Sequence, residues 1–139
     1  MKKPKFAVDT KVPVNQTRSE IENALAKFGA MSFAFATQPS SATVLFEFEG
    51  RRIRFDLPLP SDATETKTAK LHRERWRALF LSIKAKLVSV DTGIETFEEA
   101  FLAHVVLADG STVGQAVAPG IEDQYKTGKM SPLLLGGPS

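Results

Sequence analysis

The longest regular pattern of apolar and polar residues in this chain lies between residues 67 and 90 and has the period of an α-helix. At about 100° per residue, six apolar side chains of this stretch fall on one face: Trp76, Leu79, Phe80, Ile83, Leu87 and Val90. Lysines and arginines flank this face on both sides. The pattern predicts one long amphipathic helix that turns its apolar face toward a core and ends near Gly93.

Shorter segments alternate with a period of two, which is typical of half-buried strands. Four such segments occur, at residues 6–14, 31–36, 44–49 and 52–57. Pro13 cannot donate to a strand ladder, so the first strand is expected to lie at a sheet edge or to end there. Turn signals at residues 39–41 and at Gly50 predict that the other three strands form an antiparallel meander. Phenylalanines gather on one face of these strands, and we expect that face to form the core.

Two capping boxes predict where further helices begin. Thr17 and Glu20 have the spacing of such a box, and the helix that they open is expected to stop at Gly29. Thr96 and Glu99 repeat the arrangement. The second helix would place three apolar side chains together, those of Phe97, Phe101 and Val105.

The C-terminal part predicts one more helix, because apolar residues recur there at every fourth position. They are Val113, Val117, Ile121 and Tyr125. Pro119 and Gly120 are expected to bend or interrupt this helix. Residues 61–68 are polar and have no period, which favours a mobile linker, and residues 129–139 are expected to be an extended tail.

This order of elements, β-α-β-β-β-α-α-α, predicts the α+β class of fold. An antiparallel sheet of about four strands with helices on one face would bury both the aromatic strand face and the long apolar helix stripe. We therefore expect a two-layer sandwich that forms a single domain of residues 1–128.

Composition narrows the class of protein. The chain has 139 residues, of which 42% are hydrophobic and 24% charged, as in a soluble globular domain. It has no cysteine, which excludes disulfides and thiolate metal sites. No apolar run approaches the roughly 18 residues of a membrane span, and the basic start lacks the apolar stretch of an export signal. We expect a cytoplasmic protein without a membrane partner.

Charge is distributed unevenly along the chain. Residues 67–86 contain seven lysines and arginines and one acid, whereas residues 91–139 contain seven acids and two lysines. Such asymmetry favours an anionic partner for the basic helix. The alternative is that the acidic C-terminal part packs beside this helix and neutralises it.

Catalytic motifs are not recognisable. His72 and His104 have no carboxylate or second histidine at ligand spacing, so we expect neither a metal nor a cofactor. A nucleophile elbow, a phosphate-binding glycine loop and a dinucleotide-binding fingerprint are all missing from the sequence. We interpret the protein as non-enzymatic.

One nuclease hypothesis requires a specific test. The restriction-endonuclease-like core begins with a similar order of elements and needs an acid on one strand and an acid-x-Lys pair on the next. Glu47 and Glu49 precede Arg52, Arg54 and Asp56, and no lysine has the required spacing. Arginine stays protonated and is a poor proton shuttle. The preferred interpretation is a charge ladder across two strands, with the two glutamates opposite the two arginines.

The basic helix allows two interpretations. Long lysine and arginine stems commonly cover the rim of an apolar stripe while their charged ends stay solvated. Alternatively, the cations bind the phosphates of a nucleic acid without reading bases. The candidate phosphate contacts are Lys70, Arg73, Arg77, Lys84 and Lys86, extended by Arg51, Arg52 and Arg54 of the neighbouring hairpin. Four to seven such contacts predict a slope of log K against log salt of roughly −3 to −6.

Four strings carry a resemblance to known proteins: RSEIE at 18–22, GRRIRFDLPLP at 50–60, RWRAL at 75–79 and FEEAFLAH at 97–104. From Thr17 to about Gly128 the chain resembles small proteins encoded by tailed bacteriophages and prophages. The resemblance implies a location in the cytoplasm of a bacterial host cell. It carries no catalytic motif and no functional residue that can be transferred to this chain.

In a phage setting, three functions are compatible with these features. The first is a nucleic-acid-binding accessory protein that holds phosphates with the basic helix. The second is an inhibitor of a host defence system, similar to an anti-CRISPR protein, that docks on a host protein or nucleoprotein complex through its basic helix or its acidic C-terminal half. The third is a virion component, for which a homo-oligomer is expected.

Overall fold

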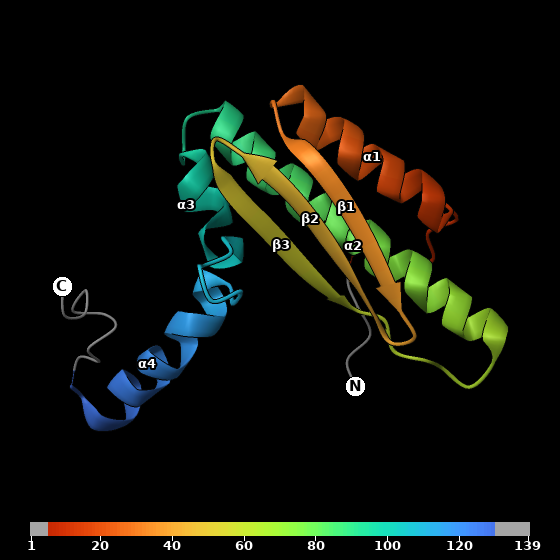
Figure 1. The fold of residues 1–139 in the computed structure, drawn as a ribbon. Helices are drawn as coiled ribbons and strands as arrows, with labels where there is room; N and C mark the ends of the chain where they lie inside the picture. Colours follow the sequence, from red (N-terminus) through yellow and green to blue (C-terminus); the bar gives the residue numbers. More distant parts are fainter. Residues whose placement is uncertain (1–5, 130–139) are drawn as a thin grey trace.

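The computed structural model describes residues 6–129 and shows an α+β fold, in which a three-stranded antiparallel sheet is covered on one face by helices (Figure 1). The strands are β1 (Met31–Gln38), β2 (Ser41–Phe48) and β3 (Arg51–Pro58). The helices are α1 (Val14–Lys27), α2 (Glu65–Asp91), α3 (Phe97–Phe101), the 3-10 turn η1 (Leu102–His104) and α4 (Val113–Thr127).

The predicted meander is confirmed, with strand order β1-β2-β3. Glu49 and Gly50 have φ angles of 47° and 77°, so both residues of the second hairpin turn lie in the left-handed region. This is the geometry of the turn that matches the twist of antiparallel strands. In the resulting register Val44 lies opposite Phe55, and their side chains share the face that the helices cover.

The predicted first strand is wrong. Residues 6–9 form bends and turns and residues 10–13 have no regular structure, and Ala7 and Asp9 have φ angles of 63° and 61°, outside the range of a regular strand. The backbone N–H of Asp9 donates instead to Oε1 of Glu74 at 3.0 Å, which satisfies a carboxylate that is only 9% exposed. The segment therefore lies against α2, and the sheet described here has three strands rather than about four.

Helix α1 begins earlier than its predicted capping box. Its N-cap is Pro13, and Thr17 lies inside the helix with its side chain fully buried. The reason is that Thr17 shares a buried face with Ile21 and Leu25, which places it against the core rather than at the helix end. The predicted end is confirmed, because Gly29 has φ 96° and donates to the carbonyl of Ala26 at 2.9 Å.

The Thr17 side chain gives a stability prediction. Its Oγ1 atom is buried without a hydrogen-bond partner, an arrangement that costs folding free energy. We expect Thr17→Val, which keeps the shape and removes the hydroxyl, to raise the free energy of unfolding by about 1 to 2 kcal/mol in urea denaturation. The control Thr17→Ser keeps the hydroxyl and removes the methyl group, and should lower stability. A destabilised valine variant would contradict the assignment.

Helix α2 includes part of the predicted linker. Thr64 is the N-cap and accepts a hydrogen bond from the backbone N–H of Lys67 at 3.1 Å, and Thr68 Oγ1 accepts from the N–H of Asp62 at 2.8 Å. The polar residues after Ser61 thus cap and begin a helix, which overturns the linker prediction for residues 65–68. The apolar stripe is confirmed, since Trp76, Leu79, Phe80, Ile83 and Leu87 are all buried.

The capping box at Thr96 is confirmed, but the helix that it opens is shorter than predicted. Helix α3 ends at Phe101, and after η1 the chain extends along the outer edge of β3. There Val105 bridges to Ile53, and the N–H of Val106 donates to the carbonyl of Arg52 at 2.8 Å. This segment pairs with the edge of β3, so Val105 does not continue the helix that its spacing from Phe97 and Phe101 predicts.

Helix α4 projects from the rest of the molecule (Figure 1). It opens with a capping box that sequence inspection missed, between Thr112 and Gln115. Pro119 lies inside the helix, which continues to Thr127, so Pro119 does not interrupt it. Among the described residues, Ile121 is 43% exposed and Tyr125 87% exposed, because α4 contacts η1 and reaches the core only near its start, at Val113.

The core is aromatic where the sheet meets α3. The ring of Phe101 contacts Phe46 and Phe55 edge-on, with centroids 6.0 and 6.1 Å apart, and stacks on Phe97 at 4.3 Å. Two residues expected on the buried strand face are outside it: Phe6 is 76% exposed and Met31 58% exposed. Phe6 lies outside the sheet, and the register shift between Met31 and Ala34 places Met31 opposite the exposed Glu47. The tail predicted for residues 129–139 falls almost wholly outside the described residues.

Over residues 6–129, no helix combines the length and apolar character required to cross a membrane.

Candidate nucleic-acid interface

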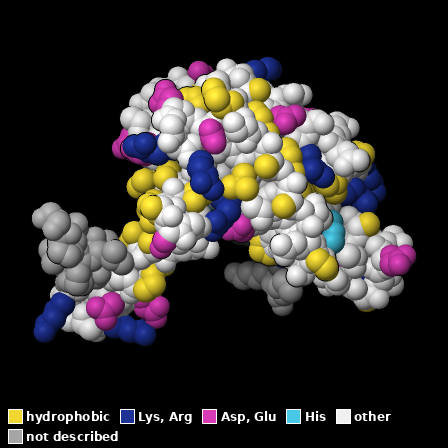
Figure 2. Space-filling model, in the orientation of Figure 1, with side chains coloured by type: hydrophobic (Ala, Val, Ile, Leu, Met, Phe, Trp, Pro, Cys, Tyr) yellow, Lys and Arg dark blue, Asp and Glu magenta, His cyan; other side chains and the backbone are white. Residues whose placement is uncertain are grey.

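The eight candidate cations lie on different sides of the sheet. Ile53 and Phe55 are buried beneath the helices, so Arg52 and Arg54, at the alternate positions of β3, project from the opposite face. Figure 2 looks onto this open face and shows separate lysine and arginine side chains among apolar ones, with no continuous cationic track. The sequence suggested that these arginines extend the basic surface of α2. Arg52 and Arg54 do not, because they lie on the other face of the sheet.

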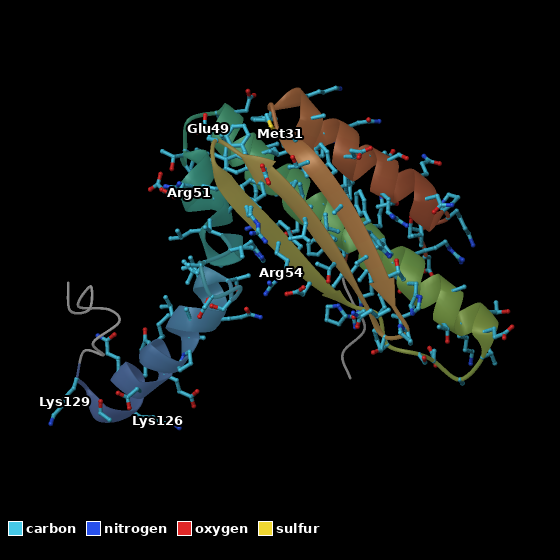
Figure 3. All side chains as sticks on the ribbon, in the orientation of Figure 1. Met31, Glu49, Arg51, Arg54, Lys126 and Lys129 are labelled. Atoms are coloured by element: carbon cyan, nitrogen blue, oxygen red, sulfur yellow. The ribbon has the colours of Figure 1, made fainter. Side chains whose placement is uncertain are left out.

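Arg54 links the sheet to the start of α4 (Figure 3). Its guanidinium donates to Asp56 Oδ2 at 3.2 Å, to the carbonyl of Gly110 at 2.7 Å and to Gln115 Oε1 at 3.0 Å. These contacts occupy three of its donor atoms. We interpret Arg54 as a structural residue that fixes the turn before α4.

The other two hairpin arginines differ from each other. Arg51 forms an ion pair with Glu98 of α3 at 2.7 Å, and both side chains are about half exposed (Figure 3). Arg52 lies opposite Glu47 in the register, as the predicted ladder requires, although no ion pair joins these two side chains in the described residues. The second half of that ladder is wrong, because Glu49 lies in the turn.

Two of the α2 cations have partners at the rim of the helix. Lys70 forms an ion pair with Asp9, with Nζ and Oδ1 2.6 Å apart, and this hydrogen bond and charge raise the pKa of Lys70 above its ordinary value. Lys86 Nζ donates to the carbonyl of Ala100 at 3.2 Å. Both ammonium groups therefore bind partners within the same chain.

Arg77 connects the two long helices. Its guanidinium forms an ion pair with Glu20 of α1 and lies over the ring of Phe80, 4.6 Å from the centroid. Both partners of the ion pair are partly buried. Glu20 directly precedes Ile21 of the buried face of α1, and only the packing of α1 beside α2 reveals that it reaches Arg77.

Arg73 and Lys84 remain without an acidic partner among the described residues. They are eleven positions apart, which places them on the same flank of α2, the flank that faces α1. Lys84 lies at the edge of a groove between α1 and α2, with Nζ 5.8 Å from the centre of the Phe80 ring.

This α1/α2 groove has a volume of about 470 Å³. Its floor is apolar, and its walls carry polar and charged side chains from both helices. The polar residues are Glu20, Asn23, Lys27, Lys84 and Asp91. Lys27 was not among the predicted contacts, because it lies 57 residues before Lys84 in the chain and no local pattern relates the two.

The histidines are structural. His104 stacks on the ring of Phe55 with centroids 3.9 Å apart, and its Nδ1 lies 3.2 Å from the carbonyl oxygen of Arg54. Burial lowers the pKa of His104 below its ordinary value, which favours the neutral ring. His72 Nε2 lies 3.2 Å from the carbonyl oxygen of Pro60. No cluster of three or more potential metal ligands exists within the described part of the chain.

Two exposed acids have a lowered pKa because they cap turns. Hydrogen bonds from the backbone and side chain of Thr96 lower the pKa of Glu99, and hydrogen bonds from Ser111 lower the pKa of Asp109. These carboxylates stabilise the start of α3 and the turn before α4. Neither is placed near the α1/α2 groove.

No family model, curated protein or solved structure matches this chain significantly. The functional interpretation therefore depends on the geometry of the chain itself.

Proposed function

We propose that this protein is a non-enzymatic nucleic-acid-binding accessory protein that holds phosphates along the α1/α2 groove. The observation that supports this proposal is that Lys27 of α1 and Lys84 of α2 line one groove, with Arg73 further along the same flank and no acidic partner on Arg73 or Lys84 among the described residues. Flexible ammonium groups in an open, solvated groove bind phosphates as point charges and need no base contacts.

The intramolecular ion pairs reduce the number of contacts. Arg51, Arg54, Lys70 and Arg77 each have an acidic partner, Lys86 donates to the carbonyl of Ala100, and Arg52 projects from the opposite face of the sheet. We therefore assign the phosphate contacts to three residues: Lys27, Arg73 and Lys84. Glu20 and Asp91 also border the groove and repel phosphates nearby. The proposal thus predicts weak, sequence-independent binding rather than a tight specific complex.

The test is a fluorescence anisotropy titration with labelled single- and double-stranded DNA and RNA. Three phosphate contacts predict a slope of log K against log salt of about −2.1 to −2.7, and hence a loss of affinity of about 20- to 40-fold between roughly 50 and 200 mM salt. This slope is shallower than the sequence alone suggested. Affinity that does not change with salt, or no binding at the lower salt concentration, would overturn the proposal.

A second candidate, docking on a host protein or nucleoprotein complex, is favoured by the exposed acids of the projecting helix α4. Glu122 and Asp123 are exposed there, away from the α1/α2 groove, although Glu122 also forms an ion pair with Lys126 at 3.1 Å, and these acids could imitate the charge of a nucleic acid. We expect such a partner to be captured from a bacterial lysate even after nuclease digestion, and to be lost with Glu122→Gln and Asp123→Asn. A partner that disappears on nuclease digestion would favour the first candidate.

A further inference from the structure

The floor of the α1/α2 groove is apolar, although the groove is open to solvent. It is formed by Ala24 and Phe28 of α1 and by Phe80, Leu87 and Val88 of α2. Val88 is 53% exposed and Phe28 is only partly buried, so apolar surface from both helices stays accessible. A phosphate gains nothing from such surface, because its contacts are ionic. The phosphate contacts of the proposed function therefore leave this floor without a role.

Two ammonium groups face each other across this floor. Helices α1 and α2 run side by side in the same direction (Figure 1), and Glu20 of α1 is paired with Arg77 of α2. Lys27 and Lys84 follow these two residues by seven positions each, about two helical turns, so they lie opposite each other. Neither lysine forms an ion pair among the described residues. Because the two like charges repel each other, an anionic group between them is stabilising.

Charges along α2 determine where the phosphates of a bound strand lie. Asp91, two turns beyond Lys84 at the end of α2, borders the groove and repels phosphates there. Arg73 lies on the same flank of α2 in the opposite direction from Lys84. The phosphates therefore extend from the lysine pair toward Arg73, and the apolar floor at Val88 lies on the other side of that pair. A group that occupies this floor is uncharged, has an apolar face and is attached to a phosphate.

We propose that the α1/α2 groove binds single-stranded nucleic acid, with one unstacked base against Val88 and Phe28 and its phosphate between Lys27 and Lys84. This inference rests on the proposed function and names the form of nucleic acid that the groove takes. Only a single strand offers both groups at one place, because the bases of a duplex are paired and stacked inside it. Contact with the face of a base tolerates any sequence, since every base has such a face.

The test compares two labelled single strands that carry the same number of phosphates, by fluorescence anisotropy. One is an oligothymidylate of about 12 nucleotides, and the other is a strand of equal length whose sugars carry no bases. Phosphate contacts are the same for both strands, whereas only the first can place a base on the apolar floor. We expect the abasic strand to bind roughly five- to tenfold more weakly at equal salt, with a similar slope of log K against log salt.

The variant Val88→Ser removes part of the apolar floor without changing a charge. It should lower the affinity for oligothymidylate to nearly that for the abasic strand and leave the salt slope unchanged. The matched control Ile121→Ser removes a similarly exposed β-branched side chain from α4, away from the groove, and should leave both affinities unchanged. Lys84→Gln, by contrast, should weaken the binding of both strands alike and flatten the slope. Circular dichroism checks that each variant is folded.

Equal affinity for the two strands, with a salt slope of about −2.1, would overturn this inference and leave the proposed function standing, because phosphates alone would then account for binding. An advantage of oligothymidylate that survives Val88→Ser would place the base outside the groove and also overturn it. If neither strand binds at roughly 50 mM salt, the proposed function itself fails, and this inference fails with it.

Discussion

Replacing Phe101 by alanine is expected to lower the free energy of unfolding by about 3 to 5 kcal/mol. Phe101 is fully buried and contacts the rings of Phe46, Phe55 and Phe97, so its removal leaves a cavity where the sheet meets α3. The surrounding rings come from rigid strands and a capped helix, which restricts collapse into the cavity.

Urea denaturation followed by tryptophan fluorescence measures this effect, since the single Trp76 is buried. Leu102→Ala is the matched control, because Leu102 is the next residue and is 47% exposed; it should cost less than about 1 kcal/mol. If Phe101→Ala proves too unstable to measure, Phe101→Leu retains much of the apolar volume and should show an intermediate loss. Equal stability of the Phe101→Ala and Leu102→Ala variants would contradict the proposed core.

Removing the three assigned phosphate contacts, by Lys27→Gln, Arg73→Gln and Lys84→Gln, is expected to abolish most of the salt dependence of nucleic-acid binding. Each phosphate contact contributes about 0.7 to 0.9 to the slope of log K against log salt. Single variants should therefore flatten the slope by that amount, and the triple variant should bring it close to zero. Anisotropy titrations at matched salt concentrations measure these slopes.

The control removes the same charge elsewhere, by Lys11→Gln, Lys126→Gln and Lys129→Gln. Lys126 and Lys129 lie at the far end of α4, away from the α1/α2 groove (Figure 3). We expect this control to keep a slope near that of the wild type. An equal loss in both triple variants would mean that net charge, rather than the groove, controls binding, and would contradict the assigned site.

Local patterns predicted much of the fold. The apolar stripe of α2, the meander of β1 to β3, the turn at Gly50 and the capping box at Thr96 were all visible in the sequence. Each depends on residues within a few positions of one another, where periodicity and capping chemistry act directly.

Errors arose where a local pattern competed with a distant contact. The alternation of residues 6–14 suggested a strand, yet Asp9 binds Glu74 of α2 and the chain turns. The spacing of Val105 suggested a helix, yet the free edge of β3 extends that segment instead. In both cases a partner far along the sequence satisfies backbone hydrogen bonds that the local pattern does not provide for.

The candidate site likewise combines features that local patterns predict with features that depend on contacts between distant residues. The amino-acid sequence by itself determined that α2 is basic, amphipathic and buried along one face, because helical periodicity and charge counts are properties of a short segment. Only the tertiary structure decided which cations stay free: Glu20 reaches Arg77, Asp9 reaches Lys70, and Lys27 joins the groove from α1. Ion pairs between side chains more than fifty residues apart depend on how helices pack, and that packing leaves no local signal in the sequence.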